Sequence, residues 1–122
     1  MGNRDQVPLR FNFDRLFEVT SGDKNFEAKL VDEFIHGLPE SVARLVSAIR
    51  NLDGDRALLE SHALRGSAAS LGAERLGQLS DHVHDMIGAG QLDIAMQQMK
   101  RLREESSAVV ELLREYRLGH AA

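Results

Sequence analysis

A chain of 122 residues is the length of one domain, and its 43% hydrophobic and 28% charged residues are ordinary for a globular protein. The sequence contains no cysteine, which excludes disulfides and thiol chemistry, and no apolar run approaches the roughly 20 residues of a membrane span. A net charge of -4 argues against nucleic acid or an anionic membrane as the main partner, and no glycine-rich nucleotide-binding loop is present.

The first half of the chain predicts an irregular start followed by two helices. Residues 1–11 look irregular, and residues 13–19 have apolar side chains at the spacing of a short opening helix. A turn then ends at Asp23, which we expect to cap a helix over residues 24–50. Pro39 should kink that helix or break it just before the proline. Its predicted core stripe consists of Phe26, Leu30, Phe34, Leu38, Val42, Leu45 and Ile49.

The second half predicts three more helices separated by short turns. Either Asp53 or Asp55 would cap the third helix, which ends at Gly72. A fourth helix covers residues 73–87, and a fifth runs without interruption over residues 91–117. The predicted seam of the fifth helix consists of Leu92, Ala95, Met99, Leu102, Ser106, Val109, Leu113 and Tyr116.

Short loops between long amphipathic helices predict an all-α fold. We expect an antiparallel up-down-up-down four-helix bundle over residues 12–118, with a short extra N-terminal helix across one end. Phe11 and Phe13 are expected to pack the N-terminal segment against this bundle. Residues 119–122, which include His120, are expected to be a disordered tail.

The third helix presents a histidine on the side opposite its core face. Each residue advances about 100° around a helix, so His62, two positions before Leu64, points roughly 200° away from it, toward solvent. The predicted core face consists of Ala57, Leu64, Ala68 and Leu71. The neighbours of His62 at helical spacing are Leu59, Arg65, Gly66 and Ala69.

Gly66 suggests that this exposed face receives another molecule. A glycine inside a helix costs about 1 kcal/mol relative to alanine, so local stability gives no reason for it. It clears the surface beside His62, and Arg65 adds a permanent positive charge. A nucleophilic nitrogen, a cation and a cleared surface suit a phosphoryl group carried by a partner protein.

The run His62-Ala63-Leu64-Arg65-Gly66, followed by Ser70-Leu71-Gly72-Ala73 and then Leu76 and Leu79, resembles histidine-containing phosphotransfer (HPt) domains. Their pattern is a histidine, a lysine or arginine three residues on, a glycine at four and a second glycine at ten. All four positions match. The similarity continues upstream through Leu16, Asp23, Phe34 and Pro39, and downstream to the last helix.

This resemblance implies that His62 is phosphorylated on Nε2, that Arg65 offsets the phosphoryl charge and that Gly66 admits the partner. The partner would be a receiver domain carrying phospho-aspartate, docked over Leu59, Ala63, Ala69 and Ser70. The receiver would supply Mg²⁺, and the phosphoryl group would then pass to a second receiver. We therefore expect a phosphotransfer protein with no cofactor or nucleotide site of its own, rather than an enzyme. The absence of a signal-peptide pattern favours the cytoplasm.

His84 departs from the family pattern. Family members often place a glutamate or glutamine here, where it can accept a hydrogen bond from Nδ1 of the active histidine. We hypothesise that neutral His84 takes this orienting role, since a histidine can also accept. A plain surface histidine is an equal alternative, and we expect His36 and His82 to be solvated. The scattered Asp and Glu residues are likewise expected on solvated faces.

Two other functions compete with phosphotransfer. A metal-carboxylate bundle needs inward-facing Glu-x-x-His motifs, and the spacing of Asp81, His82 and His84 does not supply one. A helical interaction module that works without phosphorylation is expected to have lost the histidine, and His62 is present. The sequence leaves open whether the chain is free-standing or a module of a larger kinase, its oligomeric state, and the identity of its partners.

Overall fold

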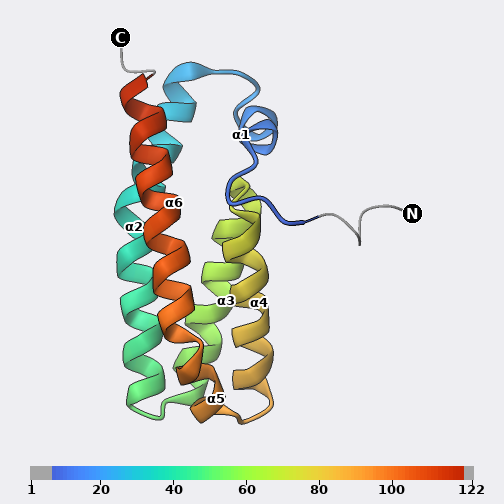
Figure 1. Cartoon of the computed structure of the whole chain (residues 1–122), viewed down its shortest axis with the longest axis vertical. Helices are drawn as coiled ribbons and strands as arrows, with labels where there is room; N and C mark the ends of the chain where they lie inside the picture. Colours follow the sequence, from blue (N-terminus) through green and yellow to red (C-terminus); the bar gives the residue numbers. More distant parts are fainter. Residues whose placement is uncertain (1–6, 120–122) are drawn as a thin grey trace, which may run out of the picture.

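The computed structural model describes residues 7–119, and those residues form a helical bundle. Figure 1 shows α2, α3, α4 and α6 side by side along the long axis, with α1 across one end and α5 at the other. This is the predicted antiparallel bundle with a short extra N-terminal helix. The helices are α1 (Phe13–Thr20), α2 (Lys24–Arg50), α3 (Gly54–Leu71), α4 (Glu74–Gly88), α5 (Leu92–Gln97) and α6 (Met99–Gly119).

Side-chain caps fix where the first three helices begin. The side chains of Asn12, Asp23 and Asp53 accept hydrogen bonds from backbone N–H groups in the first turns of α1, α2 and α3. Each bond satisfies one of the donors that a helix start leaves without a partner. Asp53 is therefore the cap of α3, whereas Asp55 lies in its first turn.

Gly72 ends α3 in the left-handed conformation, with a φ of 110°. A Cβ on this residue would lie 2.6 Å from the carbonyl oxygen of Asn12, and the backbone N–H of Asn12 donates to the carbonyl oxygen of Gly72 at 2.7 Å. The helix end and the N-terminal segment therefore meet where only glycine fits.

Replacing Gly72 with alanine should destabilise the fold by about 1–3 kcal/mol, because it adds left-handed strain and the clash with Asn12. Urea denaturation measures this loss. Gly37→Ala is the matched control, since a Cβ at Gly37 meets nothing within 4 Å. That substitution should stabilise α2 by about 0.5–1 kcal/mol. Equal midpoints for the two variants would contradict the role given to Gly72.

The predicted core faces of the third helix and of the last helical region are confirmed. Ala57, Leu64, Ala68 and Leu71 of α3 are all buried. So are the expected seam residues Ala95, Met99, Leu102, Ser106, Val109 and Leu113, while Leu92 and Tyr116 are partly buried.

The predicted stripe of α2 is confirmed at Leu38, Val42, Leu45 and Ile49, which are buried, and in part at Leu30 and Phe34, which pack partly buried against the core. At its start the stripe is wrong. Val31 and Ile35 are buried, whereas Phe26 is 43% exposed. The buried side also includes Glu27, whose carboxylate accepts a hydrogen bond of 2.6 Å from the hydroxyl of Tyr116. Burial, followed by that carboxylate, raises the pKa of Tyr116 to about 12, so the hydroxyl keeps its proton and donates. A glutamate on the core side cannot be found from hydrophobic periodicity.

Pro39 does not break α2, which continues from Lys24 to Arg50. Of the two predicted outcomes at Pro39, a kink or a break, the break is therefore wrong. Proline removes one N–H from the helix ladder, but α2 keeps a buried side on both sides of it, through Ile35 before the proline and Val42 after it. Packing of both halves against one core holds the two segments in a single helix.

The predicted fifth helix is two helices, α5 and α6, separated by Gln98. The N–H of Gln98 donates to the carbonyl oxygen of Ala95, three residues back, and its own carbonyl oxygen accepts from Leu102. This tightened turn interrupts the α-helical ladder while both flanking residues of the seam, Ala95 and Met99, stay buried. The apolar spacing continues across the break and therefore hides it.

The N-terminal segment packs on the bundle as the two phenylalanines predict. Phe11 is buried, and the ring of Phe13 lies 4.9 Å from that of Phe11 and 4.6 Å from that of Tyr116. Residues 7–12 are not helical, in line with the irregular start. At the other end α6 includes Gly119, so the expected disordered tail is wrong at this residue, and its remaining residues 120–122, which include His120, lie outside the described residues.

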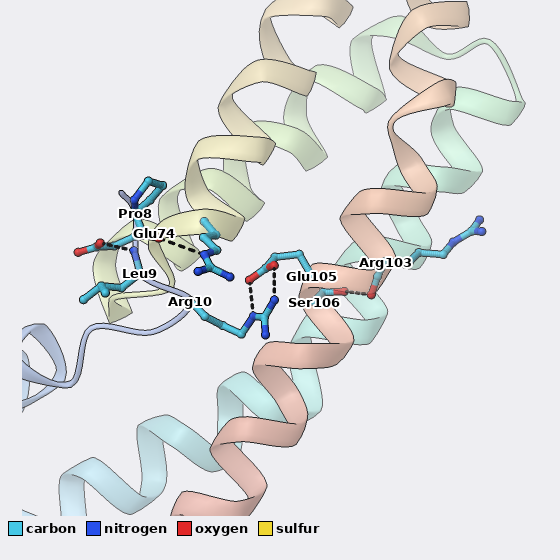
Figure 2. A network of polar contacts seen from close by, with 8 residues as sticks. Pro8, Leu9, Arg10, Glu74, Arg103, Glu105 and Ser106 are labelled. Carbon is cyan, nitrogen blue, oxygen red and sulfur yellow. Dashed lines mark hydrogen bonds and ion pairs between the residues drawn. The ribbon is translucent and has the colours of Figure 1, made fainter. Parts of the chain in front are cut away.

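Polar contacts also tie this segment to two helices, as Figure 2 shows. Glu74, at the start of α4, accepts from the backbone N–H of Leu9 at 2.9 Å and from the side chain of Asn12 at 2.8 Å. These bonds lower the pKa of Glu74, the bond from Leu9 being the larger cause. Arg10 donates to both carboxylate oxygens of Glu105 on α6, at 3.1 and 3.2 Å. The segment thus links the start of α4 to α6.

Candidate functional site

His62 lies on the solvent-facing side of α3, halfway along the helix. The predicted orientation is confirmed, because the core face of α3 is buried and His62 is exposed. The residues expected to form a partner surface are exposed with it: Leu59, Ala63, Gly66, Ala69 and Ser70.

The surface beside His62 is open in the structure. A Cβ built on Gly66 would meet nothing within 4 Å, so the helix backbone there is directly accessible. Leu59, one turn before His62, is 71% exposed. An exposed leucine next to bare backbone gives a partner both an apolar contact and room for close approach.

Arg65 joins His62 to an acidic residue of α4. Its Nη2 lies 3.1 Å from Nδ1 of His62, and its Nη1 donates to Oδ1 of Asp81 at 2.8 Å. Because a guanidinium only donates hydrogen bonds, Nδ1 of His62 must accept here. A neutral His62 ring in this arrangement therefore carries its proton on Nε2.

Asp81 is the site residue that sequence reasoning missed. The hydrogen bond from Arg65 lowers the pKa of Asp81, so the carboxylate stays ionised well into the acidic range. The expectation that the acidic side chains lie on solvated faces is wrong at Glu27, which is buried. It holds for Asp81, which is half exposed, but it gives no indication that Asp81 pairs with Arg65. The only sequence signal is an acidic residue one turn before His84 on the next helix.

His84 lies beside His62, as the family pattern implies for this position. The two ring centroids are 5.8 Å apart, with the ring planes inclined by 50°. The hydrogen bond at Nδ1 of His62 nevertheless comes from Arg65 and not from His84. Nδ1 of His84 instead lies 4.0 Å from a carboxylate oxygen of Asp85.

The open surface continues from Arg65 into a hollow of about 610 Å³ between α3, α4 and the N-terminal segment. The small residues Ala69 and Gly77 line it, together with Val7 and Pro8 of the N-terminal segment. Arg65 and Asp81 line the side nearest His62. A partner seated on His62 would therefore also meet this hollow.

The remaining histidines show no grouping suited to a metal. Glu33 and His36 of α2 have the Glu-x-x-His spacing, but both side chains are exposed, and His82 is exposed on α4. Across residues 7–119, no group of three or more histidine, aspartate or glutamate side chains is placed to hold a metal ion. The described part of the chain thus offers no observation in favour of the metal-binding alternative.

Comparisons with known proteins agree with this geometry. The Hpt domain family matches residues 29–112, more than half of the chain. The phosphorelay intermediate protein rdeA of Dictyostelium discoideum is 26% identical over 108 residues, which cover 88% of this chain but only 42% of rdeA. No helix within residues 7–119 is long and apolar enough to cross a membrane.

Two solved structures share the fold. Histidine-containing phosphotransfer protein B from Pseudomonas aeruginosa superposes with a TM-score of 0.85 at 18% identity, over 92% of this chain and 97% of that one. The HPT domain of a sensor hybrid histidine kinase from Shewanella gives 0.79 at 17% identity, over 93% and 97%. From the family match and the exposed histidine with its arginine and glycine, we conclude that this chain belongs to the Hpt domain family.

Proposed function

We propose that this chain is a phosphorelay intermediate, which accepts a phosphoryl group on His62 from the phospho-aspartate of one receiver domain and passes it to another. The observation that carries the proposal is the exposed His62 ring with the Arg65 guanidinium at its Nδ1, on a face that Gly66 leaves open. The relative rdeA, named a phosphorelay intermediate, supports it, although this chain spans less than half of rdeA.

The transfer needs a ring nitrogen with a free electron pair. In the proposed reaction Nε2 of His62 attacks phosphorus, the bond from phosphorus to the aspartyl oxygen breaks, and the aspartate leaves as a carboxylate. With Arg65 on Nδ1 the ring proton sits on Nε2, so this proton must first move to Nδ1. Arg65 must therefore leave Nδ1, and the incoming phosphoryl group is the anion that can attract it.

Arg65 then has two positions, one on His62 in the free protein and one on the phosphoryl group in the complex. Asp81 holds the guanidinium beside the site in the free protein, and we expect this ion pair to persist in the complex. Once Nδ1 carries the proton, the neighbouring ring of His84 can accept it in a hydrogen bond when His84 is neutral. We expect the receiver to supply Mg²⁺ and this chain to need no nucleotide of its own.

Arg65→Ala should slow phosphoryl acceptance by about 10–100-fold, because it removes a charge-assisted donor from the transferring group. Arg65→Lys should recover part of the rate, since lysine keeps the charge but not the fork-shaped donor. Stopped transfer assays with a phosphorylated receiver measure both. Arg101→Ala is the matched control, because Arg101 lies on α6 and its side chain donates to Gln98 and not to the His62 site. A similar loss in that variant would rule out a local role for Arg65.

Phosphoryl acceptance should weaken at mildly acidic pH more in the wild type than in His84→Gln. A protonated His84 cannot accept from Nδ1, whereas a glutamine can at any pH, and imidazoles gain their proton between about pH 5 and 8. Asp81 stays ionised over this range because its hydrogen bond from Arg65 lowers its pKa. Rate profiles from pH 5.5 to 8 test this, and superimposable profiles would remove His84 from the mechanism.

The function itself is tested by rebuilding the relay. One receiver is phosphorylated with radiolabelled acetyl phosphate, purified, and mixed with a second receiver. Label should reach the second receiver only when this chain is present, and His62→Gln should not support the transfer. His36→Gln, which changes another exposed histidine, should behave as the wild type. Label arriving equally fast with His62→Gln would contradict the proposal.

A further inference from the structure

A second concave surface lies between α2 and α6, away from the α3 and α4 face that carries His62. It is a groove of about 950 Å³ that follows α2 from Pro39 to Asn51 and α6 from Arg103 to Arg114. At 1.5 Å per residue this is roughly 17 Å of each helix. None of its lining residues belongs to α3 or α4, so the groove and the His62 face can be occupied at the same time.

The groove exists because both helices carry small side chains along it. Ala43 and Ser47 of α2 face Ser106 and Ser107 of α6 across the groove. Val42, Val46 and Val110, which are 4%, 4% and 7% exposed, form the apolar floor of the groove, and Ser106 lies at the same depth with 5% exposed. An aliphatic chain laid on this floor would exchange water for valine contacts.

Three arginines line the groove, and their side chains have no hydrogen-bond or ion-pair partner among the described residues. Within residues 7–119, Arg50, Arg103 and Arg114 are the arginines whose side chains make neither a hydrogen bond nor an ion pair, and all three line the groove. Figure 2 shows Arg103 projecting from the side of α6 opposite Glu105. The other arginines of this range are occupied: Arg10, Arg15, Arg44, Arg56, Arg65, Arg75, Arg101 and Arg117.

The charge of the groove is opposite to that of the chain. Its lining holds three arginines and one acidic residue, Glu111, whereas the whole chain carries a net charge of -4. Unpaired guanidinium groups above an apolar floor match a ligand with an anionic head and an apolar body, because carboxylates and sulfonates accept from guanidinium while the body covers the valines.

We propose that the groove between α2 and α6 binds a small anionic amphiphile, such as a fatty carboxylate. Size favours this class over a protein partner. Small-molecule sites have volumes of about 300–1,000 Å³, which includes this groove. A stable protein interface uses about 20–30 residues on each side, and 13 residues line the groove.

Sodium dodecanoate, kept below its critical micelle concentration, is the probe. In a titration of the full ¹⁵N-labelled chain, amide shifts should saturate and map to residues 39–51 and 103–114. Arg103→Gln combined with Arg114→Gln should weaken binding at least about 10-fold, since two charge-assisted contacts are lost. Ser107→Phe, an exposed position that fills the groove, should abolish it. Arg101→Gln on the same helix should bind as the wild type.

Dodecyltrimethylammonium, which has the same chain and the opposite charge, should not produce these shifts. Equal binding of the two amphiphiles, the absence of saturation, or shifts spread over exposed apolar residues such as Phe17 and Leu59 would overturn the proposal. The proposal would also be overturned if the groove did not bind dodecanoate and bound only an acidic amphipathic peptide, since that outcome identifies a protein partner. The titration does not depend on phosphotransfer, so its failure would leave the role of His62 untouched.

Discussion

His62→Gln should abolish phosphoryl acceptance, with a loss of at least about 1,000-fold, while the bundle stays folded. Removing a nucleophile removes the reaction it performs, and losses of this size or larger are usual. The side chain is exposed on α3 and contributes nothing to the core, so the free energy of unfolding should change by less than about 0.5 kcal/mol.

The measurement is transfer of radiolabel from a phosphorylated receiver, with circular dichroism and urea denaturation on the same samples. His36→Gln is the control because His36 is an exposed histidine on a different helix, with Nδ1 2.7 Å from the carbonyl oxygen of Asp32. Retained labelling in a folded His62→Gln protein would place the phosphoryl group on another side chain and contradict the role of His62. Failure of a phosphorylated receiver to label even the wild type would favour the alternative of an interaction module that works without phosphorylation.

Gly66→Leu should make the protein more stable and less active. Leucine is a better helix former than glycine, and a side chain at Gly66 meets nothing in the chain, so stability should rise by up to about 1 kcal/mol. The same side chain would stand one turn from His62 on the face where the receiver must sit. We expect phosphoryl acceptance to fall by about 100-fold, since small displacements of reacting groups have effects of this size.

Gly37→Leu on α2 separates the two effects. A Cβ at Gly37 also meets nothing within 4 Å, so this variant should gain similar stability. It lies on a different helix from His62 and should keep the wild-type rate. If Gly66→Leu transferred as fast as Gly37→Leu, the receiver would have to approach His62 from another side.

The parts of the site that lie on one helix could be predicted from the sequence. The period of α3 separates its buried residues from His62, and the same helix supplies Arg65, Gly66 and the terminal Gly72. Each of these depends on local geometry alone, namely 3.6 residues per turn and the left-handed end of a helix. Local rules therefore indicated both the fold class and the exposed histidine.

The parts of the site and of the fold that depend on contacts between helices could not be predicted from the sequence. The pair of Arg65 and Asp81 joins α3 to α4, and periodicity says nothing about which charged side chains meet across an interface. For the same reason the hydrophobic pattern of α2 does not predict that Glu27 is buried and accepts a hydrogen bond from Tyr116. The division between α5 and α6 stayed hidden because the apolar spacing runs through Gln98 unchanged.

These contacts change the proposed chemistry. The sequence predicts that Arg65 offsets the charge of the phosphoryl group and that His84 fixes the tautomer of His62. In the structure Arg65 itself holds Nδ1, so release of that contact becomes a step of the transfer. The rate loss expected for Arg65→Ala tests the role of the guanidinium that leaves Nδ1 of His62. The rate loss expected when His84 is protonated tests the hydrogen bond that Nδ1 donates afterwards.

Locating the phosphoryl group on the chain tests the whole account most directly. The wild-type protein is incubated with a phosphorylated receiver and digested at neutral or basic pH, which preserves phosphohistidine, and its peptides are sequenced by mass spectrometry. We expect a single phosphoryl group per chain, on the imidazole of His62. A stable phosphoryl group on any other side chain, or an unmodified His62 after the receiver has lost its label to this protein, would contradict the assignment.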